Sequence, residues 1–358
     1  MSGPLSGLRV VEFAGIGPGP FAGMLLADMG AEVLRIDRAG GGDWPEIPVV
    51  SRGRSSLALD LKDEEAIGTC LTAIDHADVL IEGFRPGVME RLGLGPQTVL
   101  KRNRRLIYGR VTGWGQDGPM ALLAGHDINY VSIAGALAII GDPARPPSPP
   151  LNLLGDYAGG SLYLVMGILA ALHERMSSGC GQVIDAAIVD GVSSMLAPLL
   201  GMRAAEVIEF DRARNVLGGT EAPHYRCYTC LDGRHIAVGP LEPRFRAVLS
   251  EKLGLAPATL SGVDDKEQWA RLSETLATAF AERTRDEWAE VFAGSDACVS
   301  PVLTPEEAAA HPQLGGRGAL REVDGLLQPA PAPRFSRTPG TIPGTRPTGL
   351  ALLADWCS

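Results

Sequence analysis

The sequence predicts an α/β protein with a large domain built on a parallel sheet and a smaller α/β domain. Strand-like apolar runs recur from Leu8 to Val111, and the segments between them are long enough for crossover helices. A second αβ pattern begins at about Tyr225, after the glycine pair Gly218 and Gly219. With 358 residues, the chain also exceeds the usual size of one compact core.

The large domain begins with a strand, a turn, a helix and a second strand. The β-branched run from Leu8 to Ala14 predicts the first strand, which leads into a turn rich in glycine and proline at residues 15–20. A helix from Phe21 to Met29 and a strand from Glu32 to Ile36 follow. Crossover connections make neighbouring strands parallel, so we expect helices on both faces of the sheet. Three more strands are expected at Ser56–Leu61, Ala77–Ile81 and Leu106–Val111.

The second half of the chain is less regular. Prolines at residues 142–150 exclude both a helix and a central strand, and helices are expected from Tyr157 to Met176 and from Gly191 to Phe210. Residues 313–349 are rich in Pro, Gly and Arg and predict an extended, wrapping tail, closed by a short helix from Leu350 to Trp356. These patterns predict a large domain at 1–200 completed by 330–358, a linker at 201–224, a small domain at 225–312 and a linker at 313–329.

Charge and composition argue against a nucleic-acid partner. The net charge is -10 and aromatic residues make up 5% of the chain, whereas nucleic-acid binding needs basic surfaces and stacking rings. The six scattered cysteines fit a reducing cytoplasm better than a disulfide framework. Cys227 and Cys230 form one CxxC without a second pair, so we expect no metal site.

No membrane span is expected. The N-terminus has no basic region followed by an apolar stretch, so it does not resemble a secretory signal. The longest apolar run, from Ser161 to Leu172, is shorter than the roughly 20 residues that cross a bilayer. A buried helix is the simpler interpretation of that run.

The turn after the first strand approximates a dinucleotide-binding fingerprint. Gly15, Gly17 and Gly19 lie between a strand and a helix, and Asp37 ends the second strand, so an NAD(P)-dependent oxidoreductase is one alternative. The third glycine is misplaced for GxGxxG, and Pro18 and Pro20 lack the N–H groups that a pyrophosphate needs. A structural turn, with Pro20 at the first helical position, is therefore favoured.

Residues 77–93, ADVLIEGFRPGVMERLG, resemble the signature stretch of the family III CoA-transferases and of the related 2-methylacyl-CoA racemases. Stretches at 51–62, 112–119, 179–185 and 296–302 are similar to further family segments and occur in the family's order. GHDINY at 125–130 is similar to the racemase form of the active-site segment, and GDYAGG at 155–160 to the segment with the aspartate that both branches use. The resemblance implies racemisation or epimerisation of 2-methylacyl-CoA thioesters by 1,1-proton transfer at Cα through an enolate.

Inverting a carbon beside a thioester carbonyl requires a base on one face and an acid on the other. His126 and Asp156 are the candidates, because imidazole titrates near neutral pH and partial desolvation raises the pKa of a carboxyl group. Asp156 is expected just before the apolar helix, where unpaired backbone N–H groups could stabilise the enolate oxygen. The resemblance adds Glu242, which is expected to orient or charge His126. Asn152 is a polar neighbour that could line the site.

The resemblance implies a set of residues that surround the nucleotide and diphosphate of CoA. It implies no cofactor other than the CoA that is part of the substrate. Arg52 and Arg54 also fall between expected strands, where open αβ sheets bind ligands, whereas Arg104 and Arg105 are interpreted as solvated charges. The implied positions are Arg38, Leu59, Asp60, Leu61, Lys62, Gly83, Phe84, Arg85 and Arg91, together with Gly125, Asp127, Asn129 and Tyr130.

The resemblance also implies an assembly, namely a Rossmann-like large domain in an interlocked homodimer where Asp156 and Glu242 meet across two chains. The main alternative function is a CoA-transferase in which Asp156 is the nucleophile and forms an aspartyl anhydride and thioester. Transferases of the family have a longer glycine run than Leu217–Ala222, and His126 favours the racemase. Branched fatty acyl and sterol-derived acyl groups are both open as substrates.

Overall fold

A computed structural model of the chain describes residues 3–41, 47–256, 258–344 and 346–358. The chain folds into two compact units. One consists of Met1–Ala134, Pro150–Met195 and Gly316–Ser358, and the other of Gly135–Pro149 and Leu196–Gly315. The first unit therefore takes residues from both ends of the chain.

A six-stranded parallel sheet with the order β3-β2-β1-β4-β5-β6 forms the centre of the first unit. Its register places Val11 of β1 beside Leu34 of β2 and Leu80 of β4. The predicted parallel sheet is confirmed, but the edge strand β6 was not among the expected strands, because its exposed, mixed sequence VIDAA lacks a long apolar run. The strands are β1 (Arg9–Phe13), β2 (Glu32–Arg38), β3 (Arg54–Leu59), β4 (Val79–Glu82), β5 (Ile107–Thr112) and β6 (Val183–Ala187).

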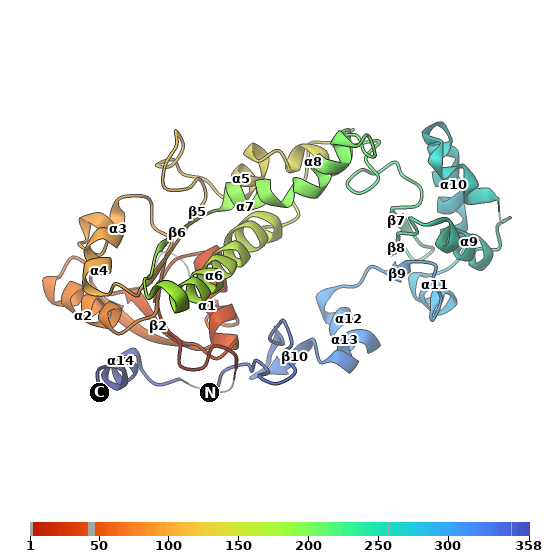
Figure 1. Cartoon of the computed structure of the whole chain (residues 1–358). Coiled ribbons are helices and arrows are strands. Elements are labelled where there is room, and N and C mark those ends of the chain that lie inside the picture. Colours follow the sequence, from red (N-terminus) through yellow and green to blue (C-terminus); the bar gives the residue numbers. More distant parts are fainter. Residues whose placement is uncertain (1–2, 42–46, 257, 345) are drawn as a thin grey trace. The chain divides into compact units, whose positions relative to one another are not determined.

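Helices cover both faces of this sheet (Figure 1). Alternation along the strands explains the two cores: Val10 of β1 packs on the face with α1 and α6, while Val11 packs on the face with α2, α3, α4 and α14. The first face has α1 (Pro18–Asp28) and α6 (Tyr163–Ser178); the second has α2 (Glu64–Asp75), α3 (Val88–Arg91), α4 (Pro96–Arg102) and α14 (Gly349–Cys357). Helix α1 begins at Pro18, three residues before the expected start at Phe21.

Three further helices complete the region that matters for function: α5 (Asp127–Ile133), a π-helical segment η2 (Leu153–Leu162) and α7 (Ile188–Met195). The expected helix from Tyr157 to Met176 is correct in its centre, but helical structure begins at Leu153 in η2 and continues as α6. Short π-helical segments are rare and concentrate at functional sites. The expected helix from Gly191 to Phe210 is wrong beyond Ala204, where α8 (Ala197–Ala204) ends.

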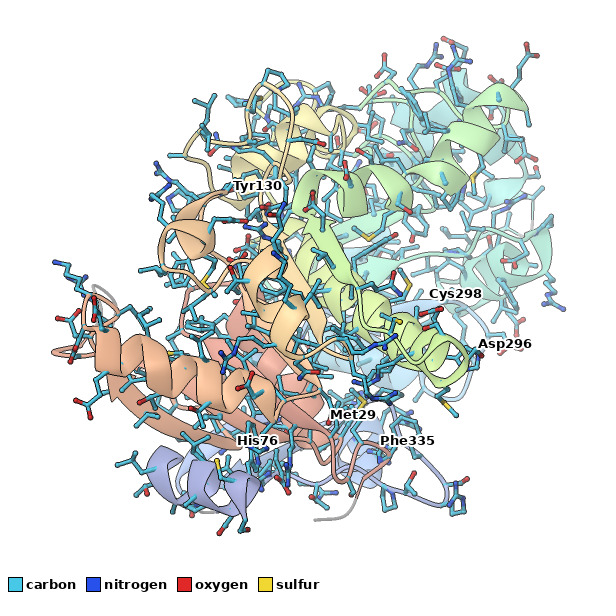
Figure 2. The ribbon with its side chains drawn as sticks, turned by 60° about the vertical axis from the view of Figure 1, so that its left-hand side comes forward. Met29, His76, Tyr130, Asp296, Cys298 and Phe335 are labelled. Carbon is cyan, nitrogen blue, oxygen red and sulfur yellow. The ribbon has the colours of Figure 1, made fainter. Side chains whose placement is uncertain are left out.

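The C-terminal segment packs on the first unit. It contains the hairpin β10 (Leu320–Val323) and β11 (Leu326–Pro329) before α14, so the expectation of a wholly extended tail is wrong. Phe335 packs against the cluster that contains Met29 (Figure 2). Trp356 of α14 is buried, and its Nε1 donates to Glu32 Oε2 at 2.8 Å. The Trp356 hydrogen bond ties the last helix to the first residue of β2.

The second unit has its own core around a three-stranded antiparallel sheet in the order β7-β8-β9. Tyr228, Phe280 and Trp288 form a ring cluster in that core. Its strands are β7 (Arg226–Thr229), β8 (His235–Val238) and β9 (Val299–Pro301). Its α-helices include α9 (Pro243–Lys252), α10 (Trp269–Phe280), α11 (Arg285–Phe292) and α12 (Pro305–Ala310). It also contains the 3-10 helices η1 (Leu137–Ile139), η3 (Thr259–Asp264) and η4 (Lys266–Gln268). Helix α13 (Pro312–Arg317) spans the boundary between the two units.

One helical stretch, Leu153–Ser178, is long and apolar enough to cross a membrane by length and composition, and it extends beyond the apolar run Ser161–Leu172 at both ends. This signal is weak, because Leu164 and Ile168 of α6 are fully buried against the sheet of the first unit. Core helices of globular proteins meet the same criteria.

Candidate active site

The carboxyl ends of the six parallel strands lie at one edge of the sheet, which is where open α/β sheets bind ligands. The strand order reverses at β1, so β1 and β4 flank the crevice that this rule predicts. The segment after β1 is the turn at residues 15–17, and the segment after β4 is Gly83–Arg85. Tyr130 lies at this edge of the sheet, because its ring packs beside Gly113, which follows β5 (Figure 2).

The turn after β1 faces Asp156. A Cβ atom built on Gly17 would lie 3.1 Å from Asp156 Oδ2, and Gly17 has a left-handed φ of 69°. Ser161 of η2 donates from its hydroxyl to the Pro18 carbonyl oxygen at 2.8 Å, which fastens η2 to the start of α1. The Asp156 carboxyl group therefore lies beside the glycine turn, which argues against a dinucleotide there.

Glycines explain how η2 can lie so close to its neighbours. A Cβ atom on Gly159 would meet the Ile188 carbonyl oxygen at 3.1 Å, and one on Gly155 would meet Asp127 Oδ1 at 2.3 Å. A Cβ atom on Gly191 of α7 would lie 2.0 Å from the Gly159 carbonyl oxygen. Side chains at these positions would push η2 away from α5 and α7 and displace Asp156.

Asp156 lies inside η2, in its first turn, not before the helix as expected. Its backbone N–H donates to Asp127 Oδ1 at 2.7 Å, so this N–H is not available to an enolate oxygen. Its carboxyl Oδ2 accepts from Asn152 Nδ2 at 3.1 Å. Partial burial raises the pKa of Asp156, the charge of Asp127 raises it further, and the Asn152 hydrogen bond and His126 oppose the rise.

His126 precedes α5 and is exposed. Asn129 fixes its backbone, since Asn129 Oδ1 accepts from the His126 N–H at 3.0 Å and the Asn129 N–H donates to the His126 carbonyl oxygen at 2.8 Å. The His126 side chain accepts from the Asn129 N–H, which completes a capping box at the start of α5. His126 is exposed, so a ligand can reach the ring.

Tyr130 anchors the segment that carries His126. Its hydroxyl donates to the Gly125 carbonyl oxygen, and its ring meets Trp114 edge to face at 4.8 Å. Burial, followed by the charges of Asp156 and Asp127, raises the pKa of Tyr130 to about 12, so the hydroxyl stays protonated at neutral pH. The prediction that Asp127 and Tyr130 contact CoA stays a prediction; their buried side chains bond inside the protein.

The positions expected to bind CoA lie along the same edge. Arg38 ends β2, Leu59 ends β3 and leads to Asp60, Leu61 and Lys62, and Gly83 follows β4. Glu82 Oε2 accepts from the Phe84 N–H at 2.7 Å, which fixes the turn that carries Arg85. In the described ranges, the exposed side chains of Arg38, Lys62, Arg85 and Arg91 form no ion pair. Four exposed cations without an ion pair in the described ranges suit a polyanionic ligand.

Arg52 and Arg54 do not belong to this set, so their interpretation as phosphate-binding candidates is wrong. Arg52 is bound to Asp28 through Nε at 2.9 Å, and its Nη1 donates to Gln328 Oε1 at 3.2 Å. Arg54 lies within β3 and pairs with Glu12 at 3.0 Å, with both side chains almost fully buried. Both arginines hold the fold together and are inaccessible to a ligand.

Glu242 belongs to the second unit, where it precedes α9 and is exposed. Its carboxylate forms no hydrogen bond with a described residue, and its charge, after burial, helps to raise the pKa of the Cys298 thiol. Its expected action on His126 remains a prediction. Among the described residues, no group of three His, Cys, Asp or Glu side chains could hold a metal ion.

Sequence comparison matches residues 5–350 to the CoA-transferase family III. The chain is 45% identical to the alpha-methylacyl-CoA racemase of Mus musculus over 338 residues, which are 94% of this chain and 87% of the mouse protein. It is 42% identical to the alpha-methylacyl-CoA racemase of Homo sapiens, again over 94% of this chain and 87% of that protein. Among solved structures, a CAIB/BAIF family protein from Brucella suis superposes with a TM-score of 0.83 at 28% identity, covering 99% of this chain and 100% of that one.

Proposed function

The chain belongs to the CoA-transferase family III, and from this premise we propose that it is a racemase of 2-methylacyl-CoA thioesters. One observation carries the proposal: the exposed imidazole of His126 lies at the start of α5, and the first residue of α5, Asp127, accepts from the backbone N–H of Asp156, whose carboxyl pKa is raised by burial. Two acid–base groups of this kind are what a 1,1-proton transfer needs. The racemase names at 42–45% identity support the same conclusion.

In this mechanism one group removes the proton from Cα and the other returns a proton to the opposite face. When His126 is the base, Asp156 must be protonated, and burial favours that form. In the reverse direction the Asp156 carboxylate is the base and the His126 imidazolium is the acid. Each direction leaves the enzyme with the protonation that the other direction requires, and no acceptor acid or redox cofactor enters the reaction.

Proton transfer at Cα separates the proposed racemase from a transferase. NMR of the protein with one epimer of a 2-methylacyl-CoA in deuterated buffer, without any other cosubstrate, follows deuterium at Cα and the appearance of the second epimer. We expect both signals. If neither appears and CoA moves to an added free acid, Asp156 is an acyl-accepting nucleophile and the enzyme is a transferase, so the racemase proposal fails.

We propose that CoA binds along the carboxyl edge through Arg38, Lys62, Arg85 and Arg91. A charge-assisted hydrogen bond to phosphate contributes roughly 1.5–3 kcal/mol, so Arg85→Ala and Arg91→Ala should each raise the Kd of CoA at least about tenfold. Titration calorimetry with free CoA measures this. Arg104→Ala is the control, because Arg104 instead contacts Cys180 Sγ at 3.3 Å. Unchanged affinity in both variants would exclude this CoA site.

The pH dependence of racemisation should report the environment of Asp156. The active form carries one proton on the pair, so activity falls on the acid side when His126 and Asp156 are both protonated. The acid limb should therefore lie above the ordinary carboxyl pKa of about 3.9. Asn152→Ala removes a hydrogen bond that stabilises the carboxylate, so it should move this limb to higher pH.

The control for this profile is Ser132→Ala, since the Ser132 hydroxyl bonds the Ile128 carbonyl oxygen and not the carboxyl group. Initial rates of racemisation are measured between pH 4 and pH 9, a range of about five units that brackets the ordinary pKa of histidine. This range covers the acid limb and the alkaline limb of the profile. An acid limb that moves to lower pH in Asn152→Ala would contradict the assignment of this limb to Asp156.

We also propose that the protein acts as an interlocked homodimer in the cytoplasm, in which Glu242 of one chain approaches the site of the other. The six free cysteines support a reducing compartment. Light scattering at micromolar concentration should give twice the mass of the 37.6 kDa chain. A monodisperse monomer would contradict the dimer, and recovery of a fluorescent fusion with the membrane or secreted fraction would contradict the location.

A further inference from the structure

Asp127 is a buried carboxylate that the proton transfer itself does not use. Only 6% of the residue is exposed. Oδ1 accepts the hydrogen bond from the Asp156 N–H at 2.7 Å, and Oδ2 is buried without a hydrogen-bond partner in the part of the chain that the structure describes. Buried carboxylates normally have both oxygens satisfied, so this arrangement has a cost that some function must offset.

We propose that Asp127 is a positioning residue for Asp156: it holds the π-helical turn of Asp156 through the backbone N–H and leaves the carboxyl group of Asp156 free to move a proton. The proposal rests on the racemase function above and adds a residue to it. Asp127 directly follows His126, so one short segment sets the positions of both acid–base groups.

The packing around Asp127 makes this contact specific. A Cβ atom on Gly155 would lie 2.3 Å from Oδ1 and 2.8 Å from Cγ of Asp127, so only glycine lets η2 approach the carboxylate this closely. Asp127 is the first residue of α5, where an acidic side chain often bonds the N–H groups of its own helix. Here the carboxylate instead bonds a residue 29 positions away, on a different helix. Capping of α5 therefore does not account for its orientation.

The charge of Asp127 adds a second effect. Asp127 and His126 from α5 and Asn152 from the segment before η2 all influence Asp156, and the residues of the turn at 15–17 carry no charge. After burial, the negative charge of Asp127 raises the pKa of Asp156, and the same two carboxylates raise the pKa of Tyr130. The unpartnered Oδ2 leaves this charge uncompensated by any described hydrogen-bond donor.

Two substitutions separate position from charge. Asp127→Ala removes the acceptor, so Asp156 should shift, and kcat for deuterium incorporation at Cα should fall about 10²-fold while KM changes little. Asp127→Asn keeps an amide oxygen that can accept from the Asp156 N–H. It should therefore recover most of kcat, and because it removes a neighbouring charge it should move the acid limb to lower pH.

A readout independent of catalysis is backbone amide exchange followed by mass spectrometry. The peptide that contains Asp156 should exchange faster in Asp127→Ala than in the wild type or in Asp127→Asn. Asp117→Ala removes an exposed carboxylate of the first unit and is the matched control for charge. Thermal unfolding checks that each variant is folded.

The inference is overturned if Asp127→Ala keeps wild-type kcat and wild-type amide protection. It is also overturned if Asp127→Asn is as slow as Asp127→Ala although its amide protection is intact, because the charge and not the contact would then be responsible. A wild-type enzyme without Cα exchange would instead refute the racemase function, and amide exchange would still test the contact.

Discussion

Replacing Asp156 by alanine should lower the rate of racemisation by about 10²- to 10⁴-fold, and replacing His126 by alanine should do the same. Each group is both the acid of one direction and the base of the other, so neither variant can complete an inversion. Chiral analysis of the acyl group after incubation with a single epimer of the CoA thioester measures this loss.

The same two variants should differ in the proton exchange that remains. In Asp156→Ala, His126 can still remove the proton that faces it and return a solvent deuteron to the same face, so one epimer should exchange with retention. In His126→Ala the other epimer should do so. Deuterium incorporation, measured separately from each epimer by NMR, should therefore show mirrored preferences.

Retention of full exchange from both epimers in both variants would remove His126 and Asp156 from the mechanism. Loss of all exchange from both epimers, with intact CoA affinity and an unchanged thermal midpoint, would mean that the two groups do not act on opposite faces. Ser132→Ala serves as the folded control on the same helix, since its hydroxyl bonds only the Ile128 carbonyl oxygen.

Much of the first unit could be predicted because apolar periodicity is a local property of the sequence. Successive side chains of β1 point to opposite faces of the sheet, and both faces are buried: Val10 packs in one core and Val11 in the other. The edge strand β6 could not be predicted in this way, because only two of its five residues are buried and Asp185 interrupts it. An edge strand needs little apolar surface, so its pattern is weak.

The candidate site shows a different limit. His126 and Asp156 were recognised from family resemblance, which is confirmed by the match over residues 5–350. The hydrogen bond between Asp127 and the Asp156 N–H joins residues 29 positions apart and has no local signature. Three glycines in η2, Gly155, Gly159 and Gly160, were the available sign that this segment packs unusually closely. Likewise, no local pattern distinguishes the buried Arg54 from the free Arg85.

The buried pair of Arg54 and Glu12 leads to the prediction with the largest effect on stability. Their exposed side-chain fractions are 1% and 0%, and Arg54 also donates to the Pro20 carbonyl oxygen at the start of α1. Arg54→Met would leave Glu12 as an uncompensated charge, with Oε1 already lacking a described partner. Breaking a buried pair in this way destabilises a fold by about 3–5 kcal/mol. Urea unfolding followed by circular dichroism measures this loss.

The loss of stability in Arg54→Met should depend on pH, because it depends on the charge of Glu12. Burial raises the pKa of Glu12, so the folded state binds its proton more tightly than the unfolded state does. Stability from a raised carboxyl pKa is present below the ordinary value of about 4.3 and is lost as pH rises through the folded value. In Arg54→Met the opposing charge is gone, the pKa of Glu12 rises further, and the deficit relative to wild type should shrink as pH falls toward 5, within roughly one unit of the ordinary value.

Two further variants decide whether the buried charge causes the loss. The double variant Glu12→Leu with Arg54→Met removes both charges and should recover part of the stability, because an apolar pair of similar volume replaces the buried ions. Arg102→Met is the control, since Arg102 pairs with Asp75 on the surface, where 45% and 33% of the two side chains are exposed, and its loss should leave unfolding nearly unchanged. If Arg54→Met were as stable as Arg102→Met at pH 8, a value well above the ordinary carboxyl pKa of about 4.3, Glu12 would have to be neutral in the wild-type fold. The pair would then be a hydrogen bond between an arginine and a protonated acid, with Arg54 still donating to the carbonyl oxygens of Pro20, Val50 and Arg52.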